Sequence, residues 1–320
     1  MTSSVSKTGK GATASVKALI ARIQAIEADE EEATLKIGRD ATLHVSHLRK
    51  TFFPDVGLTK GDVMRYYVGV SPYLLPVMRD RPLALKRFPD GVGGPSFFQQ
   101  KAPHDPPSSV RIETIESEAG EAQERLIGGS LVTLMYCVQL GAIEVNPWNA
   151  RVQSLEFPDY SVIDLDPGPR VPFAGVVETA LWVKEALDSH GIHAAVKTSG
   201  SRGIHIVLPL PAKTEERVSV QLAERIATEV VEKHPKATTV QRALKARGDT
   251  KVYVDYGQNA RGKTVAAVYS VRAKPDATVS TPLRWEELTP KLDLHRFTIQ
   301  TIPARIARLG DIWAETMRGP

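Results

Sequence analysis

The residues best suited to do chemistry lie in the segment Ser161-Val-Ile-Asp164-Leu-Asp166-Pro-Gly168, where a β-branched apolar run ends in two carboxylates. Alternate residues of a strand face the same side, so Asp164 and Asp166 are expected to project together at a strand end. Two neighbouring carboxylates repel each other, and a divalent cation is the usual way to keep both ionised. The pair predicts a metal site. A strand running into an exposed turn, a sugar-nucleotide transferase and some phosphatases show the same spacing.

A second apolar run, Lys251-Val-Tyr-Val-Asp255, delivers a third acid into the polar loop Tyr-Gly-Gln258-Asn259. Three carboxylates at strand ends suit two octahedral cations, one activating an attacking oxygen and the other neutralising a leaving phosphate. Taken alone, Asp255 fits a surface strand equally well.

The segment Thr198-Ser199-Gly200-Ser201-Arg202-Gly203 predicts a turn that binds phosphate. Glycines let backbone amides approach an anion, hydroxyls donate to phosphate oxygens, and a guanidinium can grip phosphate with two bonds. It is not a Walker A loop, because the Gly-Lys-Ser/Thr ending and the following helix are missing. A plain polar hairpin turn is the alternative, and His205, just beyond it, could be an ordinary core histidine.

Basic and aromatic residues alternate in two nearby segments, Lys86-Arg87-Phe88 and Phe97-Phe98. Cations that meet phosphates and rings that stack on bases are typical of a nucleic-acid surface. Lys50 and Lys60 flank a Pro-Asp-Val-Gly turn and could add two phosphate contacts. Paired phenylalanines are otherwise more often core, and isolated lysines more often solvated surface.

The elements that must position these residues alternate between strands and helices, which predicts a mixed α/β (α+β) fold. Strands are expected at 42–45, 83–88, 110–116, 124–127, 161–165, 194–198, 204–210, 251–255 and 264–269. Helices are expected at 14–32, from Thr59 onward, and at 130–140, 173–190 and 214–233. Thr59 is followed three residues later by Asp62, as in a capping box.

We divide the chain into a flexible tail with an amphipathic helix, 1–38, and a catalytic domain, 39–320. The tail proper is 1–12, and the catalytic domain contains two packed subdomains, about 39–155 and 156–320. No internal repeat is visible.

Composition excludes several classes of protein. The 320 residues are 42% hydrophobic and 24% charged, as in ordinary globular proteins, and the net charge of +4 permits a polyanionic partner. The single cysteine, Cys137, lies in an apolar run and is expected to be a buried, reduced thiol of a cytosolic protein. Neither a membrane span nor a secretory signal is visible.

Taken together, these segments resemble the polymerase domain of bacterial DNA ligase D and its stand-alone primase-polymerase relatives, in the archaeo-eukaryotic primase superfamily. The segments that carry the resemblance occur in the family's order: Val45–Pro54 with Thr59–Asp62, Arg81–Phe98, Asp164–Gly168, Thr198–Gly203, Val254–Asn259 and Ala266–Arg272. They cover about residues 40–315. The family fold is an N-terminal αβ module packed against a catalytic module that resembles an RNA-recognition motif.

The resemblance implies that Asp164, Asp166 and Asp255 bind two catalytic divalent cations, Mn²⁺ or Mg²⁺. It implies nucleotide contacts for Lys86, Phe98, Asn146, Ser199, Gly200, Arg202, His205, Arg247 and Gln258. It implies DNA contacts for Lys50, Lys60, Arg87 and Phe97, with the two lysines on a 5′-phosphate.

Two positions depart from the family pattern. Arg202 stands where the family usually has lysine, so a planar fork replaces a point charge. Asn146 stands where a histidine is common, which removes a proton shuttle but leaves an amide able to bond a phosphate oxygen.

The implied function is template-directed polymerisation at DNA breaks or short gaps, with ribonucleotides preferred and 5′-phosphorylated ends recognised. The alternatives are a primase that starts chains de novo, a catalytically idle DNA-end-binding module, and a sugar transferase. No Lys-x-Asp-Gly motif of a ligase occurs. The expected partners are gapped or broken DNA, NTP or dNTP substrates, a separate DNA ligase and end-binding repair proteins. We expect a cytoplasmic, nucleoid-associated monomer without membrane contact.

Overall fold

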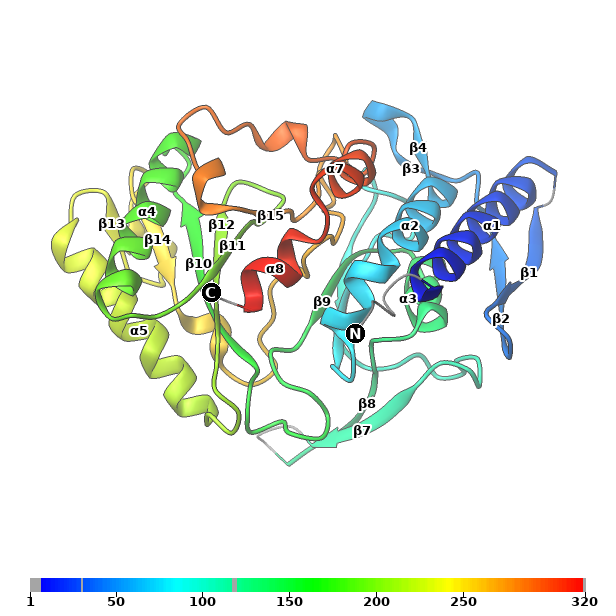
Figure 1. The fold of residues 1–320 in the computed structure, drawn as a ribbon, viewed down its shortest axis with the longest axis horizontal. Coiled ribbons are helices and arrows are strands. Elements are labelled where there is room, and N and C mark those ends of the chain that lie inside the picture. Colours follow the sequence, from blue (N-terminus) through cyan, green and yellow to red (C-terminus); the bar gives the residue numbers. More distant parts are fainter. Residues whose placement is uncertain (1–6, 30, 117–119, 319–320) are drawn as a thin grey trace, which may run out of the picture.

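The structure, a computed structural model, describes residues 7–29, 31–116 and 120–318 (Figure 1). In the N-terminal half the elements are α1 (Lys7–Asp29), β1 (Glu32–Ile37), β2 (Ala41–Ser46), β3 (Thr51–Phe53), β4 (Leu58–Thr59), α2 (Lys60–Met78), β5 (Leu83–Arg87), β6 (Phe97–Gln99), β7 (Ile112–Glu116), β8 (Ala122–Leu126), α3 (Leu131–Gln139) and β9 (Ala142–Pro147). Within the described residues the strands of this half form three hairpins, β1-β2, β3-β4 and β7-β8, and a three-stranded sheet in the order β6-β5-β9.

The C-terminal half is built on a six-stranded sheet in the order β13-β14-β10-β12-β11-β15, counted over the residues described. Its elements are β10 (Tyr160–Pro167), α4 (Phe173–Ser189), β11 (Ala195–Thr198), β12 (Ile204–Pro209), α5 (Glu216–Lys233), β13 (Thr238–Thr239), α6 (Leu244–Arg247), β14 (Val252–Asp255), β15 (Pro282–Leu283), α7 (Ile302–Leu309) and α8 (Ile312–Arg318). Helices and sheets in both halves confirm the mixed α/β class.

The residue alternation of β10 decides which face of this sheet carries chemistry. Ser161, Ile163 and Leu165 are buried under α4 and α5, and the Ser161 hydroxyl donates to the carbonyl of Ser219 in α5 (3.1 Å). Because side chains alternate across a strand, Asp164 and Asp166 lie on the opposite face, away from these helices.

Helix α1 is part of the packed core. Ile23 and Ile26 are fully buried, and α1 lies against α2 (Figure 1). The Glu27 carboxylate accepts a hydrogen bond from the Thr59 hydroxyl (2.5 Å), and it also pairs with Arg65 of α2. A side chain at Gly61 would strike this carboxylate, since a Cβ there would lie 2.5 Å from Glu27 Oε1.

Several sequence predictions are corrected at the N-terminus. Residues 7–12 belong to α1 and not to a loose tail, while residues 1–6 lie outside the described ranges. The helix ends at Asp29, and Glu32 already begins β1, a strand that the sequence analysis missed. The proposed domain division stays a prediction: its 38/39 boundary lies in the turn between β1 and β2, which pair antiparallel, and its 155/156 boundary lies between β9 and β10.

The strand predicted at 264–269 is wrong. Thr264 makes an isolated bridge to Trp148, and the residues after it form an irregular buried segment. Its backbone amides bond to different neighbours in turn, Ala267 N to Val145 O (3.0 Å) and Tyr269 N to Ser280 O (2.7 Å), so no continuous ladder forms. The apolar composition reflects burial between the two halves.

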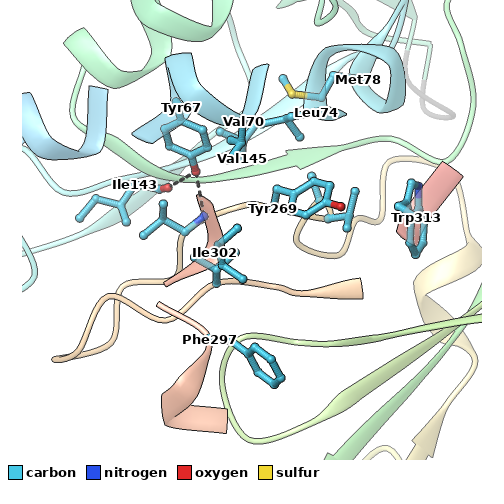
Figure 2. Packing of buried hydrophobic residues seen from close by; sticks show 14 of the residues in the cluster. Tyr67, Val70, Leu74, Met78, Ile143, Val145, Tyr269, Phe297, Ile302 and Trp313 are labelled. Atoms are coloured by element: carbon cyan, nitrogen blue, oxygen red, sulfur yellow. Dashed lines mark hydrogen bonds between the residues drawn. The ribbon is translucent and has the colours of Figure 1, made fainter. Parts of the chain in front are cut away.

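Buried tyrosines join the two halves of the molecule (Figure 2). Tyr67 of α2 donates its hydroxyl hydrogen to the Ile143 carbonyl of β9 (2.7 Å) and accepts from the Val271 amide (3.0 Å). The neighbouring Tyr66 hydroxyl donates to the Tyr269 carbonyl (2.9 Å). Helix α2 therefore ties the β5-β9 sheet to the irregular segment that follows residue 264.

Tyr67→Phe is expected to lower the free energy of unfolding by about 1–3 kcal/mol, because the Val271 amide and Ile143 carbonyl would stay buried without this partner. Urea denaturation measures the change. Tyr73→Phe, on the same helix, is the matched control, since the Tyr73 hydroxyl bonds to no residue in the described ranges. Equal stabilities of the two variants would contradict this role for the Tyr67 hydroxyl.

In the described part of the chain, no helix has both the length and the apolar character required to cross a membrane.

Candidate active site

The three acids predicted from sequence come together on the open face of the six-stranded sheet. Strands β10 and β14 are antiparallel neighbours, and their register sets Asp164 directly opposite Asp255. Asp166 lies two residues further along β10, so it shares their face. Residues about ninety positions apart in the chain thus meet because two apolar strands pair.

Asp255 is held firmly by its neighbours. Its Oδ1 accepts from the Gly257 amide (2.7 Å) and the Tyr253 hydroxyl (3.0 Å), and its Oδ2 accepts from the Gln258 amide nitrogen (2.8 Å). Asp164 is different: its Oδ1 is buried and has no hydrogen-bond partner among the described residues. Gln258, predicted to contact nucleotide, lies against the third acid.

The acids repel one another electrostatically. Burial, together with the charges of Asp166 and Asp255, raises the pKa of Asp164 well above its usual range. Burial and the Asp255 charge also raise the pKa of Asp166, against the opposing effect of nearby arginines. A buried acceptor without a donor and like charges that resist ionisation both fit divalent cations. Among the described residues no ready-made cluster of three ligands exists, and both Asp255 oxygens accept bonds from protein donors.

The predicted phosphate turn follows β11 and leads into β12, and its serine braces it. Ser199 Oγ accepts from the amides of Ser201 (3.1 Å) and Gly203 (3.0 Å), which leaves its own hydrogen available to donate. Gly200 has φ +68°, and a Cβ there would lie 2.7 Å from the Ser280 backbone nitrogen, so a side chain is excluded. The exposed Arg202 donates to the Gly168 carbonyl (2.9 Å), next to the acids of β10.

Two more cations border the acids. The Arg247 guanidinium lies 3.6 Å from the centre of the Tyr253 ring, and its charge lowers the pKa of Asp166. Arg272, which the sequence analysis left without a role, bonds to the Ser199 carbonyl, and its Nε lies 3.3 Å from Glu144 Oε2. Its charge lowers the pKa of both Asp164 and Asp166. The sequence does carry a signal for Arg272: it is a positively charged residue at the end of the apolar run that begins at Ala266.

His205 and Lys197 continue the row of acids across β12 and β11. His205 lies opposite Asp164, with Nε2 3.3 Å from Asp164 Oδ1, outside hydrogen-bond alignment. Its Nδ1 lies 2.6 Å from Lys197 Nζ. Burial lowers the pKa of both side chains well below their usual values. Lys197 was not among the predicted site residues, although a lysine between Val196 and Thr198 of a buried strand is unusual.

The sheet of the N-terminal half presents a second polar and aromatic face. Lys86 pairs in register with both Phe98 and Glu144, so the three share one face. The Phe98 side chain is 66% exposed, and Lys86 Nζ lies 5.7 Å from the centre of its ring. Because Glu144 meets Arg272, this face adjoins the acids.

Three neighbouring predictions have other positions. Arg87 and Phe97 lie on the opposite face of the strands, where the Arg87 guanidinium stands 5.1 Å from the Phe97 ring centre. Arg87 also donates to the Leu140 carbonyl (2.7 Å). Asn146 is buried and donates to the Ala84 carbonyl (3.2 Å), so its amide holds β9 to β5.

Lys50 and Lys60 meet at the base of the β3-β4 hairpin, where the Lys60 amide donates to the Lys50 carbonyl (2.8 Å). Lys50 forms an ion pair with Asp90 (2.6 Å), and the buried Lys60 ammonium donates to the Ser46 carbonyl (3.0 Å). Burial and the Lys50 charge lower the pKa of Lys60 to about 8. The two lysines lie on the N-terminal half, apart from the acids.

Residues 59–313 match the model of a family described as LigD, primase-polymerase domain. The chain belongs to this family. Its fold agrees with that of a LigD solved structure, the polymerase domain from Mycobacterium tuberculosis ligase D in complex with DNA. The TM-score is 0.79 at 30% identity, covering 87% of this chain and 98% of that one. The resemblance found in the sequence is confirmed.

Two curated LigD proteins illustrate the relationship. The multifunctional non-homologous end joining protein LigD of Pseudomonas aeruginosa is 31% identical over 278 residues, which are 86% of this chain and 33% of the relative. The bifunctional LigD of Bacillus subtilis is 33% identical over 279 residues, 87% of this chain and 44% of the relative. This LigD primase-polymerase chain thus spans less than half the length of both.

Proposed function

We propose that this chain is a template-directed nucleotidyltransferase that extends primers at DNA breaks or short gaps during end-joining repair. The observation that carries the proposal is the strand register that sets Asp164 opposite Asp255, on the face beside the Ser199–Gly203 turn. Names of the relatives support it: they are end-joining proteins, and the solved polymerase domain is in complex with DNA. Ribonucleotides and 5′-phosphorylated ends are the expected preferences.

Asp164, Asp166 and Asp255 are the residues that would hold two divalent cations, Mn²⁺ or Mg²⁺. Such cations supply charge neutralisation for an attacking 3′-hydroxyl and for departing pyrophosphate. The unpartnered Asp164 Oδ1 and the raised pKa values of Asp164 and Asp166 support this assignment.

The chain's own cations and amides bind the triphosphate. Arg202 is exposed at the turn, the Ser199 hydroxyl keeps a hydrogen to donate, and Arg272 braces that turn through the Ser199 carbonyl. Arg247 adds positive charge next to Asp166. Charges placed in advance at the leaving phosphates stabilise the transition state without reorganisation, which is the main contribution of a protein to phosphoryl transfer.

The face of the β6-β5-β9 sheet binds the primer–template and the incoming base. Phe98 is exposed enough to stack on a base, and Lys86, 5.7 Å from the centre of that ring, supplies a positive charge for a phosphate beside it. Lys50 and Lys60 form a second anion site, suited to a 5′-phosphate at the far side of a gap. Arg87 and Phe97 lie on the opposite face of this sheet from Lys86 and Phe98. They can contact DNA only if the duplex extends around the β6 edge of the sheet.

We further propose that the chain acts as a monomer in the cytoplasm, at the nucleoid, with a separate DNA ligase and end-binding repair proteins. Three alternatives are less well supported. An idle DNA-end-binding module has no use for three acids on one face, and a sugar transferase has none for the Lys50–Lys60 pair or the Phe98 platform. A primase that starts chains de novo would use the same site, so only an experiment with and without a primer distinguishes it from a primer-extending polymerase.

Incorporation of labelled ribo- and deoxynucleotides into a gapped, 5′-phosphorylated duplex with Mn²⁺ tests the proposal. We expect template-directed extension that favours ribonucleotides and that chelation of the cation abolishes. A parallel reaction on a template without primer separates extension from de novo priming. Absence of cation-dependent incorporation would refute the proposed function and favour an end-binding module.

A further inference from the structure

A single row of side chains crosses four strands of the catalytic sheet. Register pairs Asp255 with Asp164, Asp164 with His205, and His205 with Lys197, so the row runs from the cation-binding acids to a lysine in the interior. Lys197 is 2% exposed. A lysine this deeply buried is costly unless its hydrogens are all bound, so its position calls for a role.

The partners of Lys197 determine where its hydrogens point. Nζ lies 2.8 Å from the Ala266 carbonyl and 2.7 Å from Ser280 Oγ. The carbonyl can only accept, and the Ser280 hydroxyl gives its own hydrogen to the Thr198 carbonyl (2.8 Å), so it too must accept from Lys197. The remaining direction of the amine faces His205 Nδ1 at 2.6 Å.

The charge of Lys197 sets the state of His205. A charged Lys197 gives its third hydrogen to Nδ1, so the ring hydrogen of a neutral imidazole sits on Nε2, which faces Asp164 Oδ1 at 3.3 Å, whereas a neutral amine would accept a hydrogen from Nδ1. Beside an ionised Asp164, the form that holds a cation, the opposite tautomer would point an imidazole lone pair at a carboxylate oxygen. Hydrogen bonds between catalytic groups are often long before ligands bind. The 3.3 Å separation of His205 Nε2 and Asp164 Oδ1 therefore agrees with a hydrogen bond that shortens when ligands bind.

We propose that Lys197 is a positioning residue: it holds His205 with its ring hydrogen on Nε2, and His205 in turn orients the Asp164 carboxylate. Groups behind cation-binding carboxylates typically change activity about 10- to 100-fold when removed. Through Ala266 and Ser280, Lys197 also secures the segment that carries Arg272. The effect on polymerisation rests on the function proposed above, whereas the tautomer of His205 does not.

The first measurement uses the unaltered protein. Nitrogen-15 NMR of histidine-labelled protein, with His205→Gln to assign the resonance, reports which ring nitrogen carries hydrogen. We expect a hydrogen on Nε2 and an Nδ1 resonance displaced by an accepted hydrogen bond. A hydrogen on Nδ1 would overturn the proposal, whether or not the protein polymerises.

The second measurement uses Lys197→Met, which keeps the length of the side chain and removes its donors. We expect kcat for extension to fall about 10- to 100-fold, KM for the nucleotide to stay within about twofold, and Nδ1 to take the resonance of a nitrogen without a donor. Thr281→Val is the matched control, because the Thr281 hydroxyl is equally buried in the same segment but bonds only to the Val279 carbonyl. Equal kcat in both variants would overturn the positioning role. Should Lys197→Met fail to fold, the NMR result on the unaltered protein still decides.

Discussion

Asp164→Ala is expected to abolish primer extension, with a fall of about a thousandfold or more, while affinity for a DNA end stays within about twofold. Asp164 stands between Asp166 on its own strand and Asp255 on the next, so its removal leaves two carboxylates where three converge. If the loss of a cation ligand raises the activation free energy of extension by several kcal/mol, the rate falls by about a thousandfold. DNA affinity depends instead on the cations and rings of the β6-β5-β9 face and the hairpin lysines. Gel-based extension and fluorescence anisotropy on the same gapped duplex measure the two quantities.

The stability of Asp164→Ala is a separate check, because a variant that unfolds would lose activity for another reason. Burial and the charges of Asp166 and Asp255 raise the pKa of Asp164, so alanine removes an unfavourable buried acid and the variant should stay folded like the parent protein. Asp188→Ala is the control, because Asp188 is an exposed carboxylate on α4 that, within the described part of the chain, pairs only with Lys184, four residues earlier. Substantial extension by Asp164→Ala, or an equal loss in Asp188→Ala, would refute the assignment.

Replacing Lys50 by alanine and Lys60 by methionine together is expected to remove the preference for a 5′-phosphorylated gap. Hydrogen bonds to charged groups contribute about 1.5–3 kcal/mol each, so a preference of about 10- to 100-fold should fall to about one. The ratio of affinities for gapped duplexes with and without the 5′-phosphate measures it. Lys233→Ala removes an exposed lysine on α5 and is the control. An unchanged ratio in the double variant would reject the anion site.

The same site should respond to pH. Burial and the Lys50 charge lower the pKa of Lys60 to about 8, so its ammonium is charged below that pH and becomes neutral above it. The preference for the phosphorylated gap in the parent protein should therefore be full near pH 7 and decline as pH rises through about 8 to 9. In a Lys60→Met variant that decline should be absent.

Local pattern predicted the elements that deliver the acids. The apolar runs before Asp164 and Asp255 form β10 and β14, and Thr59 and Asp62 form the expected capping box at the start of α2. These features depend on neighbouring residues alone, since side-chain alternation and cap geometry are properties of a short stretch of chain.

Contacts that depend on the pairing of distant strands could not be predicted from the local sequence. Lys197 and Arg272 acquire their positions only when β11 pairs with β12 and the segment after Ala266 folds over the Ser199–Gly203 turn. For the same reason the apolar run at 264–269 was taken for a strand, because burial by tertiary contact and burial within a sheet select the same residue types. Cross-strand pairing of β9 with β5 likewise sets the contact of the Asn146 amide with the Ala84 carbonyl, which the local sequence does not indicate.

The docking of α1 has a practical consequence for fragments of this protein. Glu27 supplies negative charge at the N-terminal end of α2, the helix whose first residue is Lys60, and it occupies the space left by Gly61. The family match begins at residue 59, so a fragment trimmed to that boundary would lack this carboxylate as well as Lys50. If such a fragment bound DNA ends weakly, the cause would be the missing Glu27 carboxylate and the missing Lys50. The result would say nothing about the polymerase chemistry itself.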